Sequence, residues 1–359
     1  MSEQQLEQQK HKLFSKMEEL AMSEKIFTFR MGKKILQYAL VLLIALSINF
    51  FMPRLAPGDP LQYFFGDSSL NELTVEQRLA VEKELGLDLP VWQQYIQFIT
   101  SLFHLDMGSS IKYGVPVTEV LAERIPWTVL LVAPSLLLSA VIGIAIGAYA
   151  AWNRGKKRDV FLLTSMLTIE AIPGFWIGML LIAIFSVQLG WFPSFGIGSM
   201  SDMKGVYELF IHFLQHSFLP IVTITIASIG SNFLLTRASM LDTLGQDYMS
   251  MAEAKGVSKS HLIFKHALRN ALLPVYTHFT MSLGVLVGGA VIVETVFSYP
   301  GVGRLLYESV VARDFPMMQG VFLVITLAVI LANLLADITY PLFDPRARTR
   351  RKVSESHEK

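Results

Sequence analysis

Long apolar stretches alternate with polar ones along most of this chain. A helix that crosses a bilayer needs about 20 mostly apolar residues, and stretches of that length recur through the sequence. They predict six spans, at about 33–53, 127–150, 160–186, 216–237, 275–297 and 319–342. The third is interrupted by Pro173 and Gly174. The pattern therefore predicts an all-α, polytopic membrane protein with six transmembrane helices.

The polar stretches divide the chain further. Residues 54–126 are too long for a simple turn and predict a large outer loop that carries amphipathic helices. Residues 1–32 read either as an amphipathic extension on the inner membrane surface or as a disordered tail. The predicted organisation is an N-terminal extension, a transmembrane domain with an outer and a cytoplasmic loop, and a basic tail: 1–32, 33–345 (loops 54–126 and 238–274) and 346–359.

Composition agrees with a membrane protein. The chain is 52% hydrophobic and 16% charged, whereas soluble domains carry roughly 25% charged residues. The formal net charge of +1 lacks the basic excess of a nucleic-acid-binding protein. The absence of cysteine excludes disulfides and thiol chemistry.

Lys and Arg positions predict the orientation, because cytoplasmic loops are enriched in these residues. With the N-terminus inside, most of the 30 basic residues fall on the cytoplasmic side. With six spans, both termini are then cytoplasmic.

The cytoplasmic loop 238–274 contains a segment that looks built for docking. Residues 244–255 are good helix formers, Gly256 suits a left-handed position after a helix, and Ser258 can cap a second helix over 259–273. Lys265 and Arg269 share one stripe of that second helix. The alternative is a surface loop whose cations only follow the inside-positive bias.

Several segments of the sequence together resemble a known family. The segments "LAPGDP", "ELGLDLPVWQQY", "DYMSMAEAKGVSKSHLIFKHALRNALLPV", "GGAVIVETVFSYPGVGRLLYESVVARDFP" and "LFDPRAR" resemble ABC importer permeases of the dipeptide/oligopeptide/nickel branch, and specifically the first of the two permeases. Residues 1–30 have no counterpart in that pattern. Glu170 stands where the family usually has a small polar residue.

The resemblance implies the partners and the coupling residues. It implies a second homologous permease that completes the pathway, two ATP-binding subunits, an extracytoplasmic substrate-binding protein and membrane lipid, without nucleic acid. The first short helix of the loop would dock in a groove of the ATPase subunit. The residues assigned to ATPase coupling are Ala252, Glu253, Ala254, Gly256, Val257, Lys265 and Arg269.

The chain lacks the G-x-x-x-x-G-K-[ST] loop that cradles ATP phosphates. We therefore expect no catalytic residue, no metal and no cofactor in this chain, with ATP and Mg²⁺ bound by partner subunits. His212 and His216 have helical spacing and are read as structural or solvated, with a shared metal ion as the alternative.

Polar residues inside spans indicate a substrate pathway, because they are costly in lipid. The candidates are Glu170, Asn49, Asn232 and Glu294. Glu170 is read either as a cavity-facing carboxylate for the amino end of a peptide or as a residue paired near the interface. The asparagines can instead hydrogen-bond between helices, and Glu294 is a gate or interface residue.

The functional prediction is a cell-membrane permease subunit for di- and oligopeptides, which is not itself an enzyme. A nickel or nickel-chelate permease of the same family is the alternative. A secondary transporter or channel would show inverted repeats and several broken spans, and the chain has one Pro-broken span. An intramembrane hydrolase would need a nucleophile and a base in the spans, and we find none.

Overall fold

A computed structural model describes the chain over residues 32–51, 74–84, 88–198, 205–258 and 261–343. The described residues form helices and connecting turns, with no strand and one isolated antiparallel bridge between Ser109 and Pro116. Almost all of the predicted extension, the tail 346–359 and the part of the outer loop before residue 74 lie outside the described residues.

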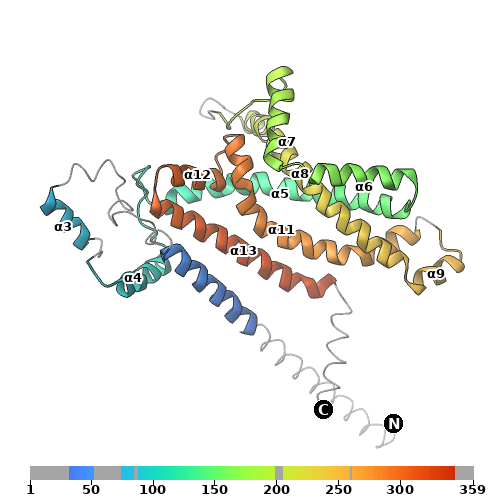
Figure 1. Cartoon of the computed structure of the whole chain (residues 1–359), viewed down its shortest axis with the longest axis horizontal. Coiled ribbons are helices and arrows are strands. Elements are labelled where there is room, and N and C mark those ends of the chain that lie inside the picture. Colours follow the sequence, from blue (N-terminus) through green and yellow to red (C-terminus); the bar gives the residue numbers. More distant parts are fainter. Residues whose placement is uncertain (1–31, 52–73, 85–87, 199–204, 259–260, 344–359) are drawn as a thin grey trace, which may run out of the picture.

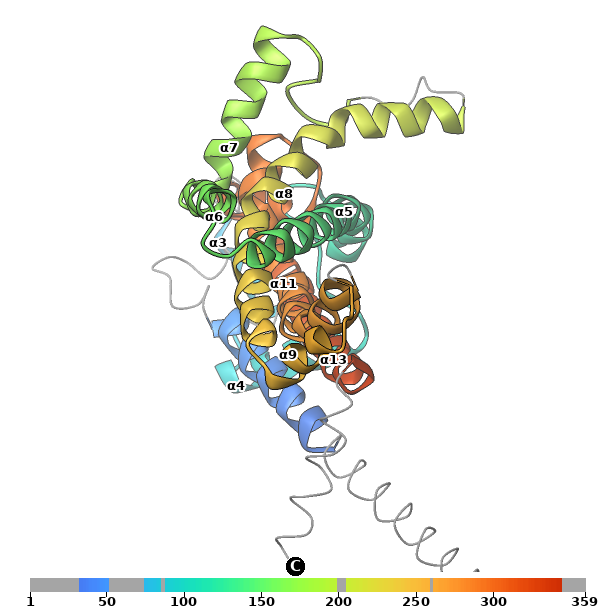
Figure 2. The same cartoon turned by 90° about the vertical axis from the view of Figure 1, so that its right-hand side faces the viewer.

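The helices are arranged as an elongated bundle with α9 at one end and α12 toward the other (Figure 1). In chain order they are Gly32–Phe51, α3 (Val75–Glu84), α4 (Val91–Phe103), α5 (Val117–Trp152), α6 (Lys157–Glu170), α7 (Gly174–Leu181), η1 (Ile182–Gln188), α8 (Val206–Leu244), α9 (Asp247–Ala254), η2 (Leu262–Leu268), α11 (Arg269–Val296), α12 (Val302–Val311) and α13 (Phe315–Phe343). Figure 2 shows α7 and the first part of α8 leading away from the rest of the bundle.

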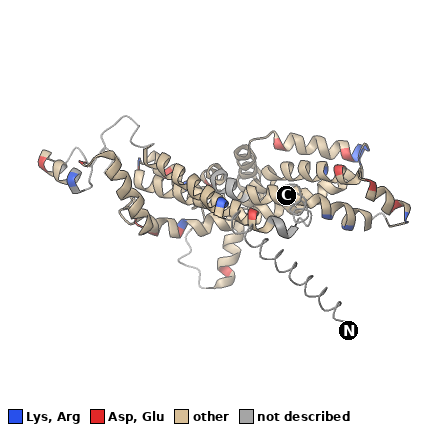
Figure 3. Cartoon of the chain, turned by 90° about the horizontal axis from the view of Figure 1, so that it is seen from below, with Lys and Arg blue, Asp and Glu red and all other residues tan. Residues whose placement is uncertain are grey.

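Within the described residues, four helices are long and apolar enough to cross a membrane, namely Gly32–Phe51, α5, α8 and α13. The pair formed by α6 and the α7–η1 segment makes a fifth if it is counted as one broken span. The fifth predicted span falls in α11, which is not part of that count, so six spans remain a prediction. Figure 3 shows long uncharged stretches of helix, with charged residues at both ends of the molecule and a few near its middle.

The break in the third predicted span is sharp. The helix axis turns by 93° between Glu170 and Gly174. Pro173 has no backbone N–H to continue the helix of α6 and instead precedes the first turn of α7, a position that proline favours.

Helix α5 extends beyond the predicted second span. It begins at Val117, so residues 117–126, which the prediction assigned to the outer loop, are helical. The hydropathy pattern did not extend the span into this segment because Glu119, Glu123 and Arg124 interrupt the apolar run. Val117 and Leu121 are nevertheless buried against α12 and α13, and this tertiary packing holds the helix.

The predicted end of the second loop helix, before Pro274, is also wrong. The π-helical turn η2 runs directly into α11, which passes through Pro274. Proline removes one helix hydrogen bond, but Ala271 and Val275 on either side of it are fully buried. Their packing keeps the helix continuous.

Helices α5 and α8 are packed backbone to backbone. A Cβ on Gly143 would lie 2.6 Å from the Cβ of Asn232, and one on Gly147 would lie 2.8 Å from the carbonyl oxygen of Phe233. The small-residue spacing in α5 thus permits a close approach. This pair is the rigid frame to which the α9 end is attached.

Candidate functional site

The α9 end of the bundle is a small helical corner with its own apolar core. Helix α9 and η2 pack onto the ends of α5 and α8. The buried members of this core are Ala148, Ala151, Met240, Met249, Leu262, Ala267 and Ala271. Because Met249 of α9 is almost fully buried, α9 is fixed to the spans and is not a free loop.

A Schellman motif ends α9. The N–H of Val257 donates to the carbonyl of Ala252 at 3.3 Å, and the N–H of Gly256 donates to that of Glu253 at 2.9 Å. Gly256 has φ +77°, the left-handed conformation that this motif requires. Ala252 and Val257 pack against the same apolar core, which is the hydrophobic contact that accompanies the motif. The left-handed glycine predicted from sequence is therefore present.

The outward face of α9 is exposed and chemically mixed. Glu253, Ala254 and Lys255 are exposed beside Tyr248 and Met251. The Asn270 amide donates to the Tyr248 hydroxyl at 3.0 Å and ties α9 to α11. This face can accept another protein without unfolding.

The two cations predicted for coupling lie close to this corner. Lys265 is on η2 and Arg269 is the first residue of α11, and both are exposed. Among the described residues, neither makes an ion pair. Phe264 is 66% exposed beside them. The structure thus places all seven coupling candidates on one corner, with Ala252 and Val257 facing partly inward.

A largely buried ion pair that sequence reasoning missed joins α8 to α6. Arg237 of α8 donates from Nε to Oδ1 of Asp159 at 2.8 Å and from a terminal nitrogen to Oδ2 at 2.9 Å. The N–H of Gly155 also donates to this carboxylate. The Asp159 side chain is 4% exposed. The only available signal was two opposite charges near span ends, and their distance of 78 residues in sequence hides the pairing.

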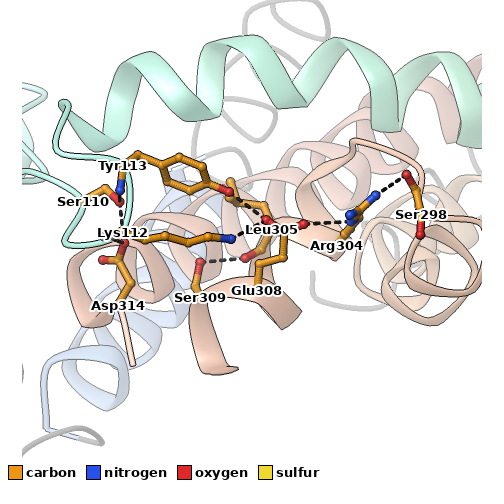
Figure 4. A network of polar contacts seen from close by, with 9 residues as sticks. All are labelled: Ser110, Lys112, Tyr113, Ser298, Arg304, Leu305, Glu308, Ser309 and Asp314. Atoms are coloured by element: carbon orange, nitrogen blue, oxygen red, sulfur yellow. Dashed lines mark hydrogen bonds and ion pairs between the residues drawn. The ribbon is translucent and has the colours of Figure 1, made fainter. Parts of the chain in front are cut away.

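The α12 end carries a second polar network (Figure 4). Lys112 and Tyr113 donate to one Glu308 oxygen at 2.8 and 2.7 Å, and Arg304 donates to the other at 2.8 Å. Asp314 accepts from the Ser110 hydroxyl and from the backbone N–H groups of Lys112 and Met317. The Met317 contact makes Asp314 an N-cap of α13. The network fastens the segment before α5 to α12 and α13.

Glu308 gives this network a pH dependence. Burial alone raises the pKa of Glu308, but hydrogen bonds from Lys112 and Tyr113 and the positive charges of Lys112 and Arg304 outweigh it and lower the pKa to about 2. A carboxyl whose pKa is lower in the folded state than in the unfolded state stabilises the fold above its unfolded pKa. That contribution is lost as the pH falls from about 4.5 toward 2.

We therefore expect the melting temperature of the wild type to exceed that of Glu308→Gln at pH 6, with the gap closing between pH 4.5 and 2. Thermal unfolding in detergent at several pH values measures this. Glu119→Gln is the matched control, because Glu119 is exposed and has no ion pair among the described residues. A gap that stays constant with pH would contradict the assignment.

The four pathway candidates occupy separate places. The Asn49 amide donates to the carbonyl oxygen of Gln319 at 2.9 Å, which links the first helix to α13. This is the inter-helix alternative weighed from the sequence. Glu170 is exposed at the end of α6 and lies over Gly230 of α8, where a Cβ would be 2.9 Å from its Oε2. Among the described residues, Glu170 has no hydrogen bond or ion pair.

Glu294, in the last turn of α11, is fully buried and faces the start of α12. Its carboxylate accepts from the Thr128 hydroxyl at 2.7 Å and from the N–H of Arg304 at 2.9 Å. Gly301 and Gly303 lie so close to this carboxylate that a Cβ on either would overlap it. Glu294 therefore holds the α11–α12 turn, and its role in a pathway stays a prediction.

Asn232 borders a cavity between α5, α8 and α11. The cavity has a volume of about 310 Å³ and is lined by Leu136, Ser228, Ser231, Asn232, His278, Phe279, Met281 and Ser282. The Asn232 amide donates to Ser139 and to the carbonyl of Ser228, both at 3.2 Å. Its Oδ1 is buried and has no hydrogen-bond partner among the described residues. Unsatisfied buried carbonyl oxygens are uncommon, and within the described part of the chain the Asn232 side chain is bonded only through its amide nitrogen.

The two histidines of the sequence analysis lie together on α8. The rings of His212 and His216 are 4.0 Å apart, and Nδ1 of His216 contacts the carbonyl of His212. The described residues contain no group of three or more His, Asp or Glu side chains that would hold a metal ion. The pair has no further protein ligand from that part of the chain.

The comparisons with known proteins agree with this architecture. Residues 143–349 match the model of the binding-protein-dependent transport system inner membrane component, and residues 27–132 match its N-terminal companion model. The inward-facing MetNI methionine ABC transporter contains a similar chain, with a TM-score of 0.53 and 18% identity over 63% of this chain and 97% of that one. That likeness concerns the fold.

Three curated relatives match this chain over almost the whole of their own length. A putative peptide transport system permease protein of Brucella abortus is 36% identical over 88% of this chain and 98% of its own. The oligopeptide transport system permease protein AppB of Bacillus subtilis is 35% identical over 85% and 95%. The glutathione transport system permease protein GsiC of Salmonella paratyphi A is 38% identical over 88% and 97%. With a match over more than half its length and relatives above 30% identity, this chain belongs to the family of binding-protein-dependent transport system inner membrane components.

Proposed function

We propose that this chain is the permease subunit of an ATP-driven importer for di- and oligopeptides and forms half of its pathway. The observation that carries the proposal is the family match together with relatives named for peptide, oligopeptide and glutathione transport. As a family member with several apolar helices, the chain is a multi-pass inner membrane protein. Nickel is the alternative cargo.

The proposed complex contains a second homologous permease, two ATP-binding subunits and an extracytoplasmic binding protein. The corner formed by α9 and η2 supports the ATPase contact, because it is exposed outside yet packed firmly onto α5 and α8 inside. A push on α9 is thereby passed to the spans. In this proposal the α9 end and both termini lie in the cytoplasm, as the Lys and Arg distribution predicts. ATP and Mg²⁺ would be bound by the partners, and this chain would carry no cofactor and no catalytic residue.

The cavity beside Asn232 is the part of the chain that best fits a peptide. Peptide backbones present N–H donors that need acceptors in a low-dielectric site. The side chains of Ser228, Ser231, Asn232, His278 and Ser282 line this space, and their hydroxyl, amide and ring atoms are the polar groups that a peptide backbone would meet. Apolar walls from Leu136, Phe279 and Met281 suit varied side chains. Glu170 remains a second proposed contact, for a free amino terminus.

Uptake by the purified complex tests the function. A tag on this chain should bring down two ATPases and a second permease, identified by mass spectrometry. Reconstituted with the binding protein, the complex should take up radiolabelled short peptides only when ATP is supplied. Nickel uptake without peptide uptake would favour the alternative cargo. ATP-independent accumulation by this chain alone would refute the proposal.

The same assay examines the cavity. Asn232→Leu should raise the KM for peptide several-fold, because it replaces a polar side chain of the cavity wall with an apolar one. Ser139→Ala is the matched control, since it removes the partner of the Asn232 amide without touching the cavity lining. Equal effects of both variants would make Asn232 a packing residue.

A further inference from the structure

Helix α4 has an apolar surface that no described residue covers. No residue of α4 is buried. Trp92 is 61% exposed, Ile96 51% and Phe103 84%. An aromatic and aliphatic surface left exposed on a short helix indicates that another molecule or an apolar solvent covers it.

The sequence of α4 separates two faces cleanly. The apolar residues Val91, Trp92, Tyr95, Ile96, Phe98, Ile99, Leu102 and Phe103 fall on one side at helical spacing. Gln93, Gln97, Thr100 and Ser101 fall on the other. The helix contains no charged residue. This is the pattern of a helix that lies flat at a boundary between an apolar and an aqueous phase.

One edge of the apolar face attaches α4 to the end of the first helix. The Phe50 ring lies 5.2 Å from that of Tyr95 and 5.4 Å from that of Phe98. The hydroxyls of Ser47 and Tyr95 are 2.7 Å apart. These contacts hold α4 beside the last turn of a candidate membrane span (Figure 1).

The other edge continues the apolar surface of that span. The exposed side chains of the first helix include Leu40, Ile44, Ile48 and Phe51. Since that helix qualifies as a span and only 11% of its apolar window is buried, these side chains are open to lipid. Trp92, Ile96 and Phe103 extend this surface sideways where the span ends.

We propose that α4 lies in the headgroup region of the bilayer, with Trp92, Ile96 and Phe103 immersed in lipid and Gln97 in water. Aromatic side chains favour this depth. Because α4 carries no charge, its immersion depends on apolar area and is independent of anionic lipid. The inference concerns a lipid contact and is separate from the identity of the cargo.

Spin labels test this directly, since the chain contains no cysteine and single-cysteine variants need no background substitution. The full chain with its co-purified partners is placed in nanodiscs and labelled at Trp92, Ile96, Gln97 or Phe103. Ile44 serves as the lipid-exposed reference. Collision of each label with oxygen, which partitions into lipid, is compared with collision with a water-soluble nickel chelate.

The ratio of oxygen to nickel-chelate collision should be several-fold higher at Ile96 and Phe103 than at Gln97, and lower than at Ile44, which lies deeper in the span. It should stay the same when anionic lipid is replaced by phosphatidylcholine. Adding Ile96→Gln and Phe103→Gln should shift a label at Trp92 toward water. Protection of Ile96 from both reagents would show a protein partner on this face and overturn the proposal, as would equal nickel-chelate access at Ile96 and Gln97.

Discussion

Replacing Arg237 with Ala is expected to lower the free energy of unfolding by about 3–5 kcal/mol, the usual cost of removing one partner from a buried pair. The Asp159 side chain is 4% exposed and receives two hydrogen bonds from Arg237. Without the guanidinium, the carboxylate keeps only the Gly155 N–H among the described residues. Unfolding in detergent by heat or denaturant measures the loss.

Two variants make this result specific. Arg158→Ala removes a neighbouring exposed arginine that donates to the Tyr149 hydroxyl, and it should cost little. The double variant Asp159→Leu with Arg237→Leu should recover most of the loss, because an apolar pair leaves no buried charge. An equal loss in Arg158→Ala, or no recovery in the double variant, would contradict a stabilising role of the ion pair between α6 and α8.

Replacing Gly256 with Val is expected to reduce ATP-dependent uptake about tenfold or more while the spans still insert. A left-handed residue with a Cβ costs roughly 1–2 kcal/mol, and a β-branched one costs more. Nothing lies within 4 Å of the Cβ position, so the cause is backbone conformation and not a clash. The Schellman bonds from Gly256 and Val257 would open, and α9 would lose its fixed angle to η2.

Asparagine is the control at this position. Asn tolerates the left-handed conformation and replaces glycine after helices, so Gly256→Asn should retain most of the uptake. Both variants are compared by uptake, by stimulation of the ATPase and by the amount of ATPase that co-purifies. Normal uptake and coupling in Gly256→Val would remove α9 from the proposed mechanism.

Local patterns were enough to predict the features that depend on neighbours in sequence. The left-handed Gly256 follows from a run of helix formers that ends in glycine. The break near Pro173 follows from its missing N–H. Helix boundaries that depend on distant contacts could not be predicted in this way. The first turns of α5, for example, contain charged residues, and they are held as helix by packing against α12 and α13.

The pathway candidates show the same division. An asparagine or glutamate in an apolar stretch signals that it needs a partner, but it does not say which. In the structure, Asn49 donates to the carbonyl oxygen of Gln319, and Glu294 accepts from a backbone N–H of α12. The Oδ1 of Asn232 is buried without a partner among the described residues. These outcomes rest on contacts between helices far apart in sequence, which periodicity cannot report.

The amino-acid sequence by itself determined that this is a helical membrane protein, which branch of transporters it resembles and where its helical corner bends. Hydrophobicity and backbone preference are properties of short segments, so they can be read from the sequence without the tertiary structure. Only the tertiary structure decided that Asp159 meets Arg237, that Glu308 gathers Lys112, Tyr113 and Arg304, and that α4 lies on the first helix. Each of these depends on side-chain geometry between segments that only folding brings within hydrogen-bond or van der Waals distance.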